Sequence, residues 1–184
     1  MARKSAIVKN AEPTTPLRLD LGCGPNKQPG YIGVDRIDFV GVDVVHDLRT
    51  PWPWADGSVS EVFSSHFYEH LTNPGRVHFL NELHRVLVPG GKATIIAPHW
   101  SNECAYGDPT HQWPPVVSFA ALYWNKEWRA VNAPHTDYTC DFDTVTGFGF
   151  DHRIMAWNTE RQMFALNHHV NAARDIHFTL TKRG

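Results

Sequence analysis

Five short apolar runs in the first half of the chain constrain the fold more than any other feature. They are rich in β-branched residues, and turn-forming residues end each of them. The runs cover residues 17–21, 31–35, 42–48, 60–65 and 92–98. Runs of this length and composition are typical of buried strands in a parallel sheet. We therefore expect a fold of the α/β class.

The segment between the fourth and fifth runs has the periodicity of a helix. In NPGRVHFLNELHRVLVPGG (73–91), Asn73 is the expected N-cap and Pro74 fits the first helical position. Apolar residues then recur at helical spacing until Pro89 and Gly90 end the pattern. A strand, a helix and a second strand in succession predict a βαβ unit within a parallel sheet.

The second half of the chain has weaker patterns. We expect a long loop at 99–115, a helix at 117–131, strands at 143–151 and 175–181, and a helix within 152–172. The last strand alternates apolar and polar residues, as half-buried strands do.

Length and charge bound the organisation of the chain. Its 184 residues predict one domain over residues 15–184, preceded by a flexible lead at 1–14. The net charge of −2 is not the electrostatic signature of a dedicated nucleic-acid binder. We leave the oligomeric state open.

Cysteine and apolar patterns exclude other classes. The three cysteines are far apart and form no Cys-x-x-Cys pair, so neither a disulfide framework nor a cysteine zinc site is expected. No run of apolar residues is long enough for a membrane helix, and the first residues lack the apolar stretch of a signal peptide. The expected location is the cytoplasm, with no membrane partner.

The first run ends in a glycine turn, LRLDLGCGPNKQPGYIGVD (17–35). A dinucleotide fingerprint would have a third glycine where Lys27 stands, followed by a full helix. Here only six residues separate Gly24 from Tyr31, too few for that helix. Asp20 also places a carboxylate beside the turn, where a pyrophosphate would be repelled. A dinucleotide or nucleotide sugar is therefore disfavoured.

A cofactor with an amino-acid end fits the same turn better. The Asp20 carboxylate can pair with an ammonium group, and glycine backbone allows close approach. Asp35 can hold two ribose hydroxyls, and Asp47 can accept from an adenine amino group. These acids lie at the ends of three successive strands, and those ends share one edge of a parallel sheet. Turn formation and capping are the alternative role for such aspartates.

At this point the sequence resembles a known family. LDLGCGP, GVD, HDL, FSSHFYEHL and ELHRVLVPGGKATIIAP are similar, in order, to the motifs of class I S-adenosylmethionine-dependent methyltransferases. The resemblance covers residues 17–98. It implies a Rossmann-like, doubly wound, mostly parallel seven-stranded sheet with an antiparallel C-terminal strand pair. It also implies three α/β/α layers, here with a shortened or missing first helix.

The resemblance further implies S-adenosyl-L-methionine as cofactor. The residues that it assigns to this cofactor are Asp20, Leu21, Gly22, Cys23, Gly24, Asp35, Arg36, Asp47, Leu48, Ser64, Ser65 and His66. The short link after Gly24 departs from the family pattern and predicts a more exposed methionine pocket, or a cover from the C-terminal half.

Catalytic candidates lie near the ends of the fourth and fifth runs. They are His66, His111, Tyr106 and Asp108. Histidine titrates near neutrality, which makes His66 and His111 the first candidates for a base. An ordering role in a Pro-rich loop is the alternative for His111. Spacing alone does not support a metal site from His99, His111 and Asp108, so no metal is expected.

HFYEH (66–70) also matches the inverted zincin pattern H-x-x-E-H. A zinc metallopeptidase would need one continuous helix presenting His66 and His70 on one face, with Glu69 activating water. Asn73, Pro74 and Gly75 would interrupt such a helix. The alternative for Glu69 and His70 is to cap or orient a short helix.

The expected function is methyl transfer to an unidentified acceptor. The Asn/Asp-Pro-Pro-Tyr signature of base-amino methyltransferases is absent after the fourth run, where Ser64 to Phe67 stand. A small molecule, glycan or protein acceptor is therefore favoured over nucleic acid. A catalytically inactive binding protein of the same fold is the alternative.

Overall fold

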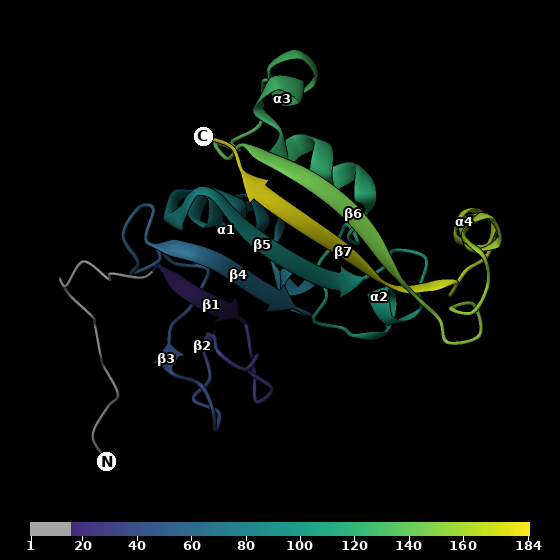
Figure 1. The fold of residues 1–184 in the computed structure, drawn as a ribbon, viewed down its shortest axis with the longest axis horizontal. Helices are drawn as coiled ribbons and strands as arrows, with labels where there is room; N and C mark the ends of the chain where they lie inside the picture. The colour runs from purple at the N-terminus through teal and green to yellow at the C-terminus, as the bar shows by residue number, and fades with distance from the viewer. Residues whose placement is uncertain (1–15) are drawn as a thin grey trace.

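The computed structural model describes residues 16–184, so the predicted flexible lead at 1–14 lies outside the described residues. Seven strands form one sheet in the order β3-β2-β1-β4-β5-β7-β6 (Figure 1). They are β1 (Leu17–Leu21), β2 (Ile32–Asp35), β3 (Val44–Val45), β4 (Val59–Ser65), β5 (Leu87–Pro98), β6 (Phe142–Phe150) and β7 (Ala173–Lys182).

The strand directions confirm the predicted sheet. The pairs β1–β2, β1–β4, β2–β3 and β4–β5 are parallel, whereas β7 runs antiparallel to both β5 and β6. The expected Rossmann-like order with an antiparallel C-terminal strand is therefore confirmed. The missing first helix is confirmed too, because residues 22–31 contain only turns and irregular backbone.

The helical segments are short except for one. They are η1 (Tyr68–His70), α1 (Asn73–Val86), α2 (Cys104–Gly107), η2 (Ser118–Trp124), α3 (Lys126–Asn132) and α4 (Thr159–His168), where η denotes a 3₁₀ helix. Among residues 16–184 we find no helix that could serve as a membrane span.

Several predicted boundaries are wrong by a few residues. The N-cap of α1 is Thr72 rather than Asn73, because the Thr72 side chain accepts a hydrogen bond from the amide of Gly75. The single helix expected at 117–131 is broken at Asn125, whose side chain caps α3 by accepting from the amide of Trp128. The predicted strand at 42–48 is reduced to the two residues of β3.

Helix α1 supplies the main apolar layer. Phe79, Leu80, Leu83 and Val86 are fully buried on the face that the spacing predicted. Further along the sheet, at β7, the ring of Trp124 in η2 lies 4.8 Å from that of Phe178. Both helices thus cover the same apolar sheet face.

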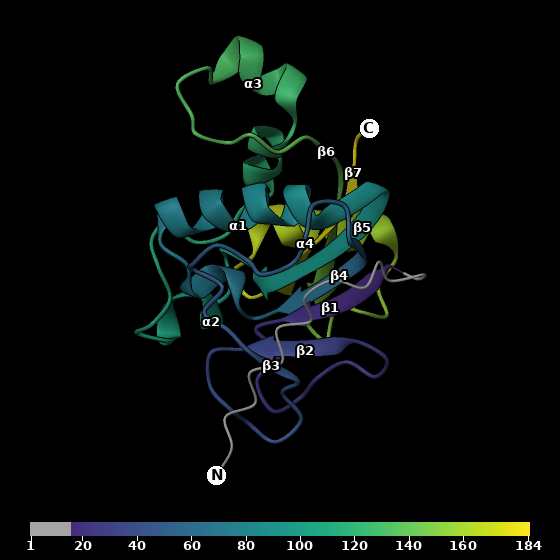
Figure 2. The same ribbon diagram turned by 90° about the vertical axis from the view of Figure 1, so that its left-hand side faces the viewer.

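The opposite sheet face carries no helix in the described part of the chain. The connections β1–β2, β2–β3 and β3–β4 are all loops. In Figures 1 and 2, α1 lies on one side of the sheet, and α4 lies beyond its end. The three predicted α/β/α layers are therefore reduced to two in residues 16–184.

The helix-free face has a polar row that suits contact with water. Arg18, Glu61, Lys92 and Thr181 are register partners on adjacent strands, so they share one face. Arg18 Nε lies 2.8 Å from Glu61 Oε2. Because the connecting loops form no helix, this row takes the place of an apolar layer. The extent of one domain over 15–184 stays a prediction.

Candidate active site

The glycine turn after β1 is held close to β2. The amides of Gly22 and Cys23 donate to the carbonyl of Val34, at 2.8 and 3.2 Å. Gly22 has a φ of +73°, and a Cβ atom there would lie 2.5 Å from the ring of Phe67. Glycine is therefore required at this position both by conformation and by space.

Asp20 lies beneath the link that replaces the first helix. It is only 2% exposed, and its Oδ2 accepts a 2.7 Å hydrogen bond from the amide of Gln28. Burial raises the pKa of this carboxyl above its ordinary value. The acid that the sequence assigned to an ammonium group thus also anchors the loop of residues 22–30.

Asp35 joins the glycine turn to the end of β2. Its Oδ2 accepts from the amide of Gly24 at 3.0 Å, and its Oδ1 accepts from the amide of Ile37 at 2.9 Å. A carboxylate offers about four acceptor positions, so two remain for further donors. This arrangement is suited to holding a diol beside the turn.

Asp47 follows β3 and makes a local ion pair. Arg49 donates to both of its carboxylate oxygens, with Nη2 2.6 Å from Oδ2. These hydrogen bonds lower the pKa of Asp47 to about 2. The adjacent Leu48 is buried, and its carbonyl accepts from the indole of Trp52 at 3.0 Å. Arg49 therefore competes for the carboxylate that the sequence assigned to adenine.

The serines at the end of β4 differ in their surroundings. Ser64 is fully buried, and its hydroxyl donates to the carbonyl of Leu21 at 2.9 Å. This bond links β4 to β1 directly behind the glycine turn. Ser65 is partly exposed and belongs to the helix-free face, where it pairs in register with Ile96.

His66 leaves β4 in an unusual conformation. Its φ is +53°, and its side chain is 53% exposed. Nδ1 lies 3.3 Å from Glu69 Oε1, and Nε2 lies 3.6 Å from Asp175 Oδ1. The Glu69 carboxylate raises the pKa of His66 above its ordinary value. Backbone strain of this kind is common where a side chain must point into a site.

A cavity of about 690 Å³ opens beside His66. Its lining comes from the residue after β4, the end of β5, α2 with the residues on either side of it, and the start of β7: His66, Pro98, Glu103, Cys104, Gly107, Asp108, Pro109, His111, Arg174 and Asp175. Three of the four predicted catalytic residues, His66, Asp108 and His111, are brought together here. The cavity lies at the carboxyl ends of β4 and β5, where ligands bind in open α/β folds.

The other catalytic candidate lies apart from this lining. Tyr106 is 56% exposed on α2 and is not among the residues that line the cavity. His99 is buried at the end of β5, where its Nδ1 lies 2.9 Å from the hydroxyl of Ser101. The metal site considered for His99 with His111 and Asp108 is therefore not formed.

Local hydrogen bonds hold the polar side chains of the loop after α2 in place. Nδ1 of His111 lies 3.2 Å from the carbonyl of Ala105, and Nε2 lies 3.9 Å from Asp108 Oδ2. The hydroxyl and amide of Thr110 donate to Asp108 Oδ1 at 2.7 and 2.8 Å. These bonds lower the pKa of Asp108. Both roles considered for His111 are consistent with this position: it orders the loop and lines the cavity.

Sequence reasoning missed the contribution of β7 and of Glu69. Asp175 and Arg174 reach the cavity because β7 runs antiparallel to β5, which pairs Asp175 with Pro98. The expected antiparallel strand pair was the signal for this. Glu69 was expected to cap a helix, but its buried carboxylate accepts no hydrogen bond within residues 16–184.

At residues 66–70 the structure does not have the continuous helix that a zinc peptidase of the H-x-x-E-H type requires. Residues 68–70 form a single 3₁₀ turn, and His66 lies before it with a positive φ. His66 and His70 therefore do not share one face of a continuous helix.

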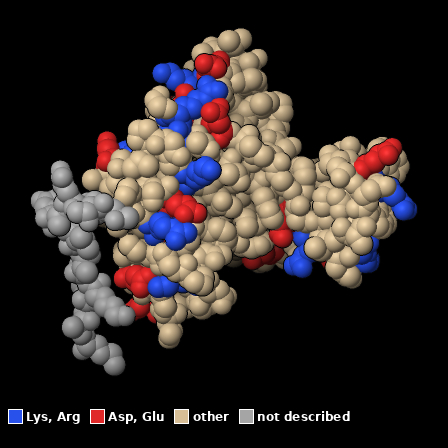
Figure 3. Space-filling model, in the orientation of Figure 1, with Lys and Arg blue, Asp and Glu red and all other residues tan. Residues whose placement is uncertain are grey.

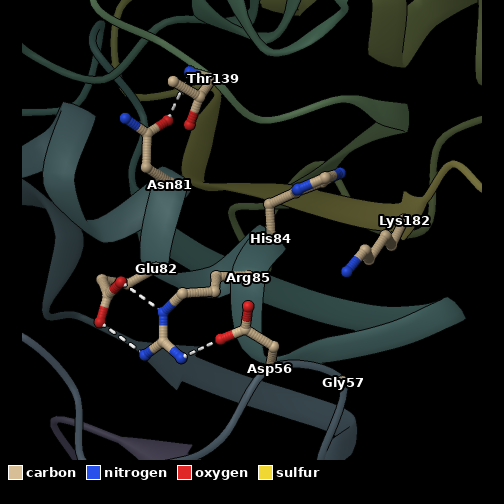
Figure 4. Close-up of a pocket in the computed structure, with 8 residues that line it drawn as sticks. All are labelled: Asp56, Gly57, Asn81, Glu82, His84, Arg85, Thr139 and Lys182. Carbon is tan, nitrogen blue, oxygen red and sulfur yellow. Dashed lines mark hydrogen bonds and ion pairs between the residues drawn. The ribbon is translucent and has the colours of Figure 1, made fainter.

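A second cavity, of about 570 Å³, lies near the amino ends of β4 and β5; Figure 4 shows the residues that line it. Its charged groups largely satisfy one another: Arg85 donates to Glu82 and to Asp56, and Asn81 accepts from the amide of Thr139. Lys182 donates to the carbonyl of Leu87 at 2.8 Å. These contacts join the end of α1 to the loops before β4 and β6, and β7 to the start of β5, which is a structural role.

One family model matches part of the chain. Residues 19–95 match the family model described as a methyltransferase domain. Among curated proteins, no sequence matches the chain significantly.

Solved structures share the fold at low identity. An S-adenosylmethionine-dependent methyltransferase from Archaeoglobus fulgidus is 19% identical, with a TM-score of 0.66 over 92% of this chain and 87% of that one. A possible histamine N-methyltransferase from Thermotoga maritima is 12% identical (TM-score 0.57; 92% and 83%). Geranyl diphosphate C-methyltransferase from Streptomyces coelicolor is 14% identical (0.52; 91% and 72%).

These neighbours establish the fold, and two of their names refer to different acceptors, so the fold alone does not identify the acceptor. The matched family model covers the glycine turn, Asp35, Asp47 and the His66 segment. Residues 19–95 therefore match a methyltransferase domain, and the fold of the chain is that of S-adenosylmethionine-dependent methyltransferases.

Proposed function

We propose that this methyltransferase acts on a small polar acceptor that enters the 690 Å³ cavity beside His66. The single observation that carries the proposal is the position of this cavity. It adjoins the end of β4, one strand away from the glycine turn that follows β1. The cavity therefore lies beside the turn that would hold the cofactor.

The cofactor assignment rests on the edge formed by β1, β2 and β3. Asp35 retains acceptor positions for the ribose hydroxyls after binding the amide of Gly24. Gly22 and Gly24 both have positive φ values, which turn the backbone sharply at the end of β1. Asp20 supplies negative charge beneath the loop, complementary to the methionine ammonium. When bound at this turn, the cofactor would supply an electrophilic methyl group.

The cavity size favours a small molecule. Pockets for such ligands are about 300–1,000 Å³, and this cavity falls within that range. Its charged lining contains Glu103, Asp108 and Asp175 against one cation, Arg174. An acceptor with a basic amino group would complement this excess of carboxylates.

The charge on the face drawn in Figure 3 does not favour nucleic acid. On the face drawn in Figure 3, Lys and Arg side chains alternate with Asp and Glu and form no broad basic patch. A phosphate backbone requires clustered cations, because neutralising its charges supplies most of the affinity. Nucleic acid therefore remains the disfavoured acceptor.

Methyl transfer is an in-line displacement, so the protein's main task is alignment and exclusion of water. His66 faces the cavity, and Asp175 and Glu69 hold its ring from two sides. We assign His66 the removal of the acceptor's proton, with His111 as the second candidate across the same cavity. A base of this type contributes about 10²–10⁴-fold.

An acceptor screen with methyl-labelled S-adenosylmethionine tests the proposal. The panel should contain small amines, hydroxylated small molecules, oligosaccharides, peptides and oligonucleotides. Label transfer to a small amine, lost in His66→Asn, is the expected result. Transfer to an oligonucleotide would overturn the acceptor class. Cofactor binding without transfer to any class would favour the inactive binding protein.

A further inference from the structure

We propose that Glu69, His70 and His111 form a binding site for a divalent transition metal. One donor atom from each of these residues lies within 4.8 Å of the donor atoms of the other two. Glu69 and His70 belong to η1, whereas His111 comes from the loop after α2. Two imidazoles with one carboxylate are a ligand set that suits Zn²⁺ and related first-row ions.

Glu69 provides an independent reason for a cation at this position. The residue is 4% exposed, and within residues 16–184 neither carboxylate oxygen accepts a hydrogen bond. The ion pair that its carboxylate makes is with His66, whose Nδ1 lies 3.3 Å from Oε1, and the charge of Arg76 also interacts with it. A buried carboxylate is costly unless it is paired or binds a metal. The contact with His66 leaves Oε2 unpaired, and a metal ion would satisfy it.

The hydrogen bonds of His70 leave one ring nitrogen free to bind metal. Nδ1 of His70 lies 2.9 Å from the hydroxyl of Thr110. That hydroxyl has one proton, which it donates to Asp108 Oδ1 at 2.7 Å. A carboxylate can only accept, so Thr110 must accept from Nδ1–H of His70. The lone pair of neutral His70 is therefore on Nε2.

The same reasoning applies to His111. Its Nδ1 lies 3.2 Å from the carbonyl of Ala105, which can only accept. Nδ1 therefore carries the proton, and the lone pair is on Nε2. Metal-binding histidines usually donate their second ring N–H to a carbonyl, a carboxylate or water, which fixes the tautomer. His111 has such a carbonyl partner, and the Thr110 hydroxyl orients His70 in the same way. The two rings lie 4.7 Å apart between centroids.

The site lies at the wall of the cavity, because His111 lines it. Three protein ligands leave at least one position of a tetrahedral shell for water or a bound molecule. The site stands on these three residues alone. Metal binding and methyl transfer are measured separately, so the failure of one leaves the other standing.

Metal titration of the full chain tests the site. The protein is stripped with a chelator and titrated with Co²⁺, followed by visible absorption, and with Zn²⁺, followed by calorimetry. We expect one equivalent per chain, bound tighter than about 10 μM. Co²⁺ should give ligand-field bands without a thiolate charge-transfer band, because the proposed ligands are nitrogen and oxygen.

Variants separate this site from other histidines and from Cys104. His70→Ala and His111→Ala should each weaken binding by more than about 100-fold, since even outer partners contribute about 10–100-fold. Thr110→Val keeps the shape but removes the hydroxyl that orients His70, so about 10-fold is expected. His152→Ala, at an exposed position, and Cys104→Ser should bind as the wild type does.

The proposal is overturned if the wild type binds neither ion in this range. It is also overturned if His70→Ala and Thr110→Val, both shown to be folded by circular dichroism, retain full affinity. Loss of binding in Cys104→Ser would assign the ion to a thiolate site instead.

Discussion

The amide of Gly24 donates a 3.0 Å hydrogen bond to Oδ2 of Asp35, which ties the glycine turn to the end of β2. In a chain that lacks the first helix, this bond and the one from Gln28 to Asp20 fix the shape of the loop. Asp20 and Asp35, at the ends of β1 and β2, are therefore part of the fold as well as part of the proposed cofactor site.

Gly22 and Gly24 provide a matched pair for testing the turn. Both have positive φ, but only at Gly22 would a Cβ meet another side chain, the ring of Phe67 at 2.5 Å. Gly24→Ala should cost about 1–2 kcal/mol from the left-handed conformation. Gly22→Ala should cost about 1–3 kcal/mol more through overpacking.

Thermal unfolding distinguishes the two variants. For a chain of this size, each kcal/mol lowers Tm by roughly 2–4 °C. Equal Tm values for Gly22→Ala and Gly24→Ala would contradict the close packing of Phe67 on the turn.

His99 should make the protein less stable as the pH falls below about 6.5. Burial lowers its pKa, and the amide of Ser101 donates to its Nδ1, which requires an unprotonated nitrogen. Because the folded pKa lies below the unfolded one, the two states bind protons equally above about pH 6.5. Below that, only the unfolded state is protonated, which removes at most about 1.4 kcal/mol per pH unit until the folded pKa is reached.

Denaturant unfolding between pH 5 and pH 8 measures this effect (roughly the range where histidine titrates). His99→Asn keeps an acceptor near the Nδ1 position and should flatten part of the slope. His84, whose pKa burial also lowers, should account for some of the remainder. His152→Asn, at an exposed position, should leave the slope unchanged. A slope in His99→Asn as steep as in the wild type would contradict the assignment.

His66→Asn should reduce turnover by about 10²–10⁴-fold with an acceptor found in the screen. Asparagine tolerates the positive φ at this position, so the backbone should be kept. Binding of S-adenosylhomocysteine should fall far less than turnover, because the ring faces the acceptor cavity.

Single-turnover rates measured beside binding affinity check this separation. His152→Asn serves as the histidine control. Turnover within about threefold of the wild type would remove His66 from catalysis and leave His111 as the candidate, on the scale expected for a general base.

The sequence predicted the sheet well because its signals are local. The five apolar runs and the periodicity of α1 encode strands and a helix within a few residues of their true bounds. The sequence predicted only part of the loss of one helical layer. The short Gly24–Tyr31 link indicated one missing helix, but not that the whole layer is absent. That this sheet face is left without helices could be recognised only from the polar row of Arg18, Glu61, Lys92 and Thr181, and these residues are far apart in sequence.

The site was predictable at the strand ends and not beyond them. Asp20 and Asp35 lie at the ends of strands and Gly22 comes directly after one, so their common edge results from parallel pairing. The meeting of His70 with His111 depends on how the loop after α2 folds back onto η1, and no periodic pattern encodes that. Tyr106 and His111 are close in sequence, yet only His111 lines the cavity.

Calorimetric titration with S-adenosylhomocysteine tests the central claim most directly, because it needs no acceptor. The wild type should bind one equivalent, and Asp35→Ala should lose binding while staying folded. Asp38→Ala, an exposed aspartate in the next loop, should bind normally. The absence of binding by the wild type at about millimolar ligand, or unchanged affinity in Asp35→Ala, would contradict a cofactor site built on the glycine turn and Asp35.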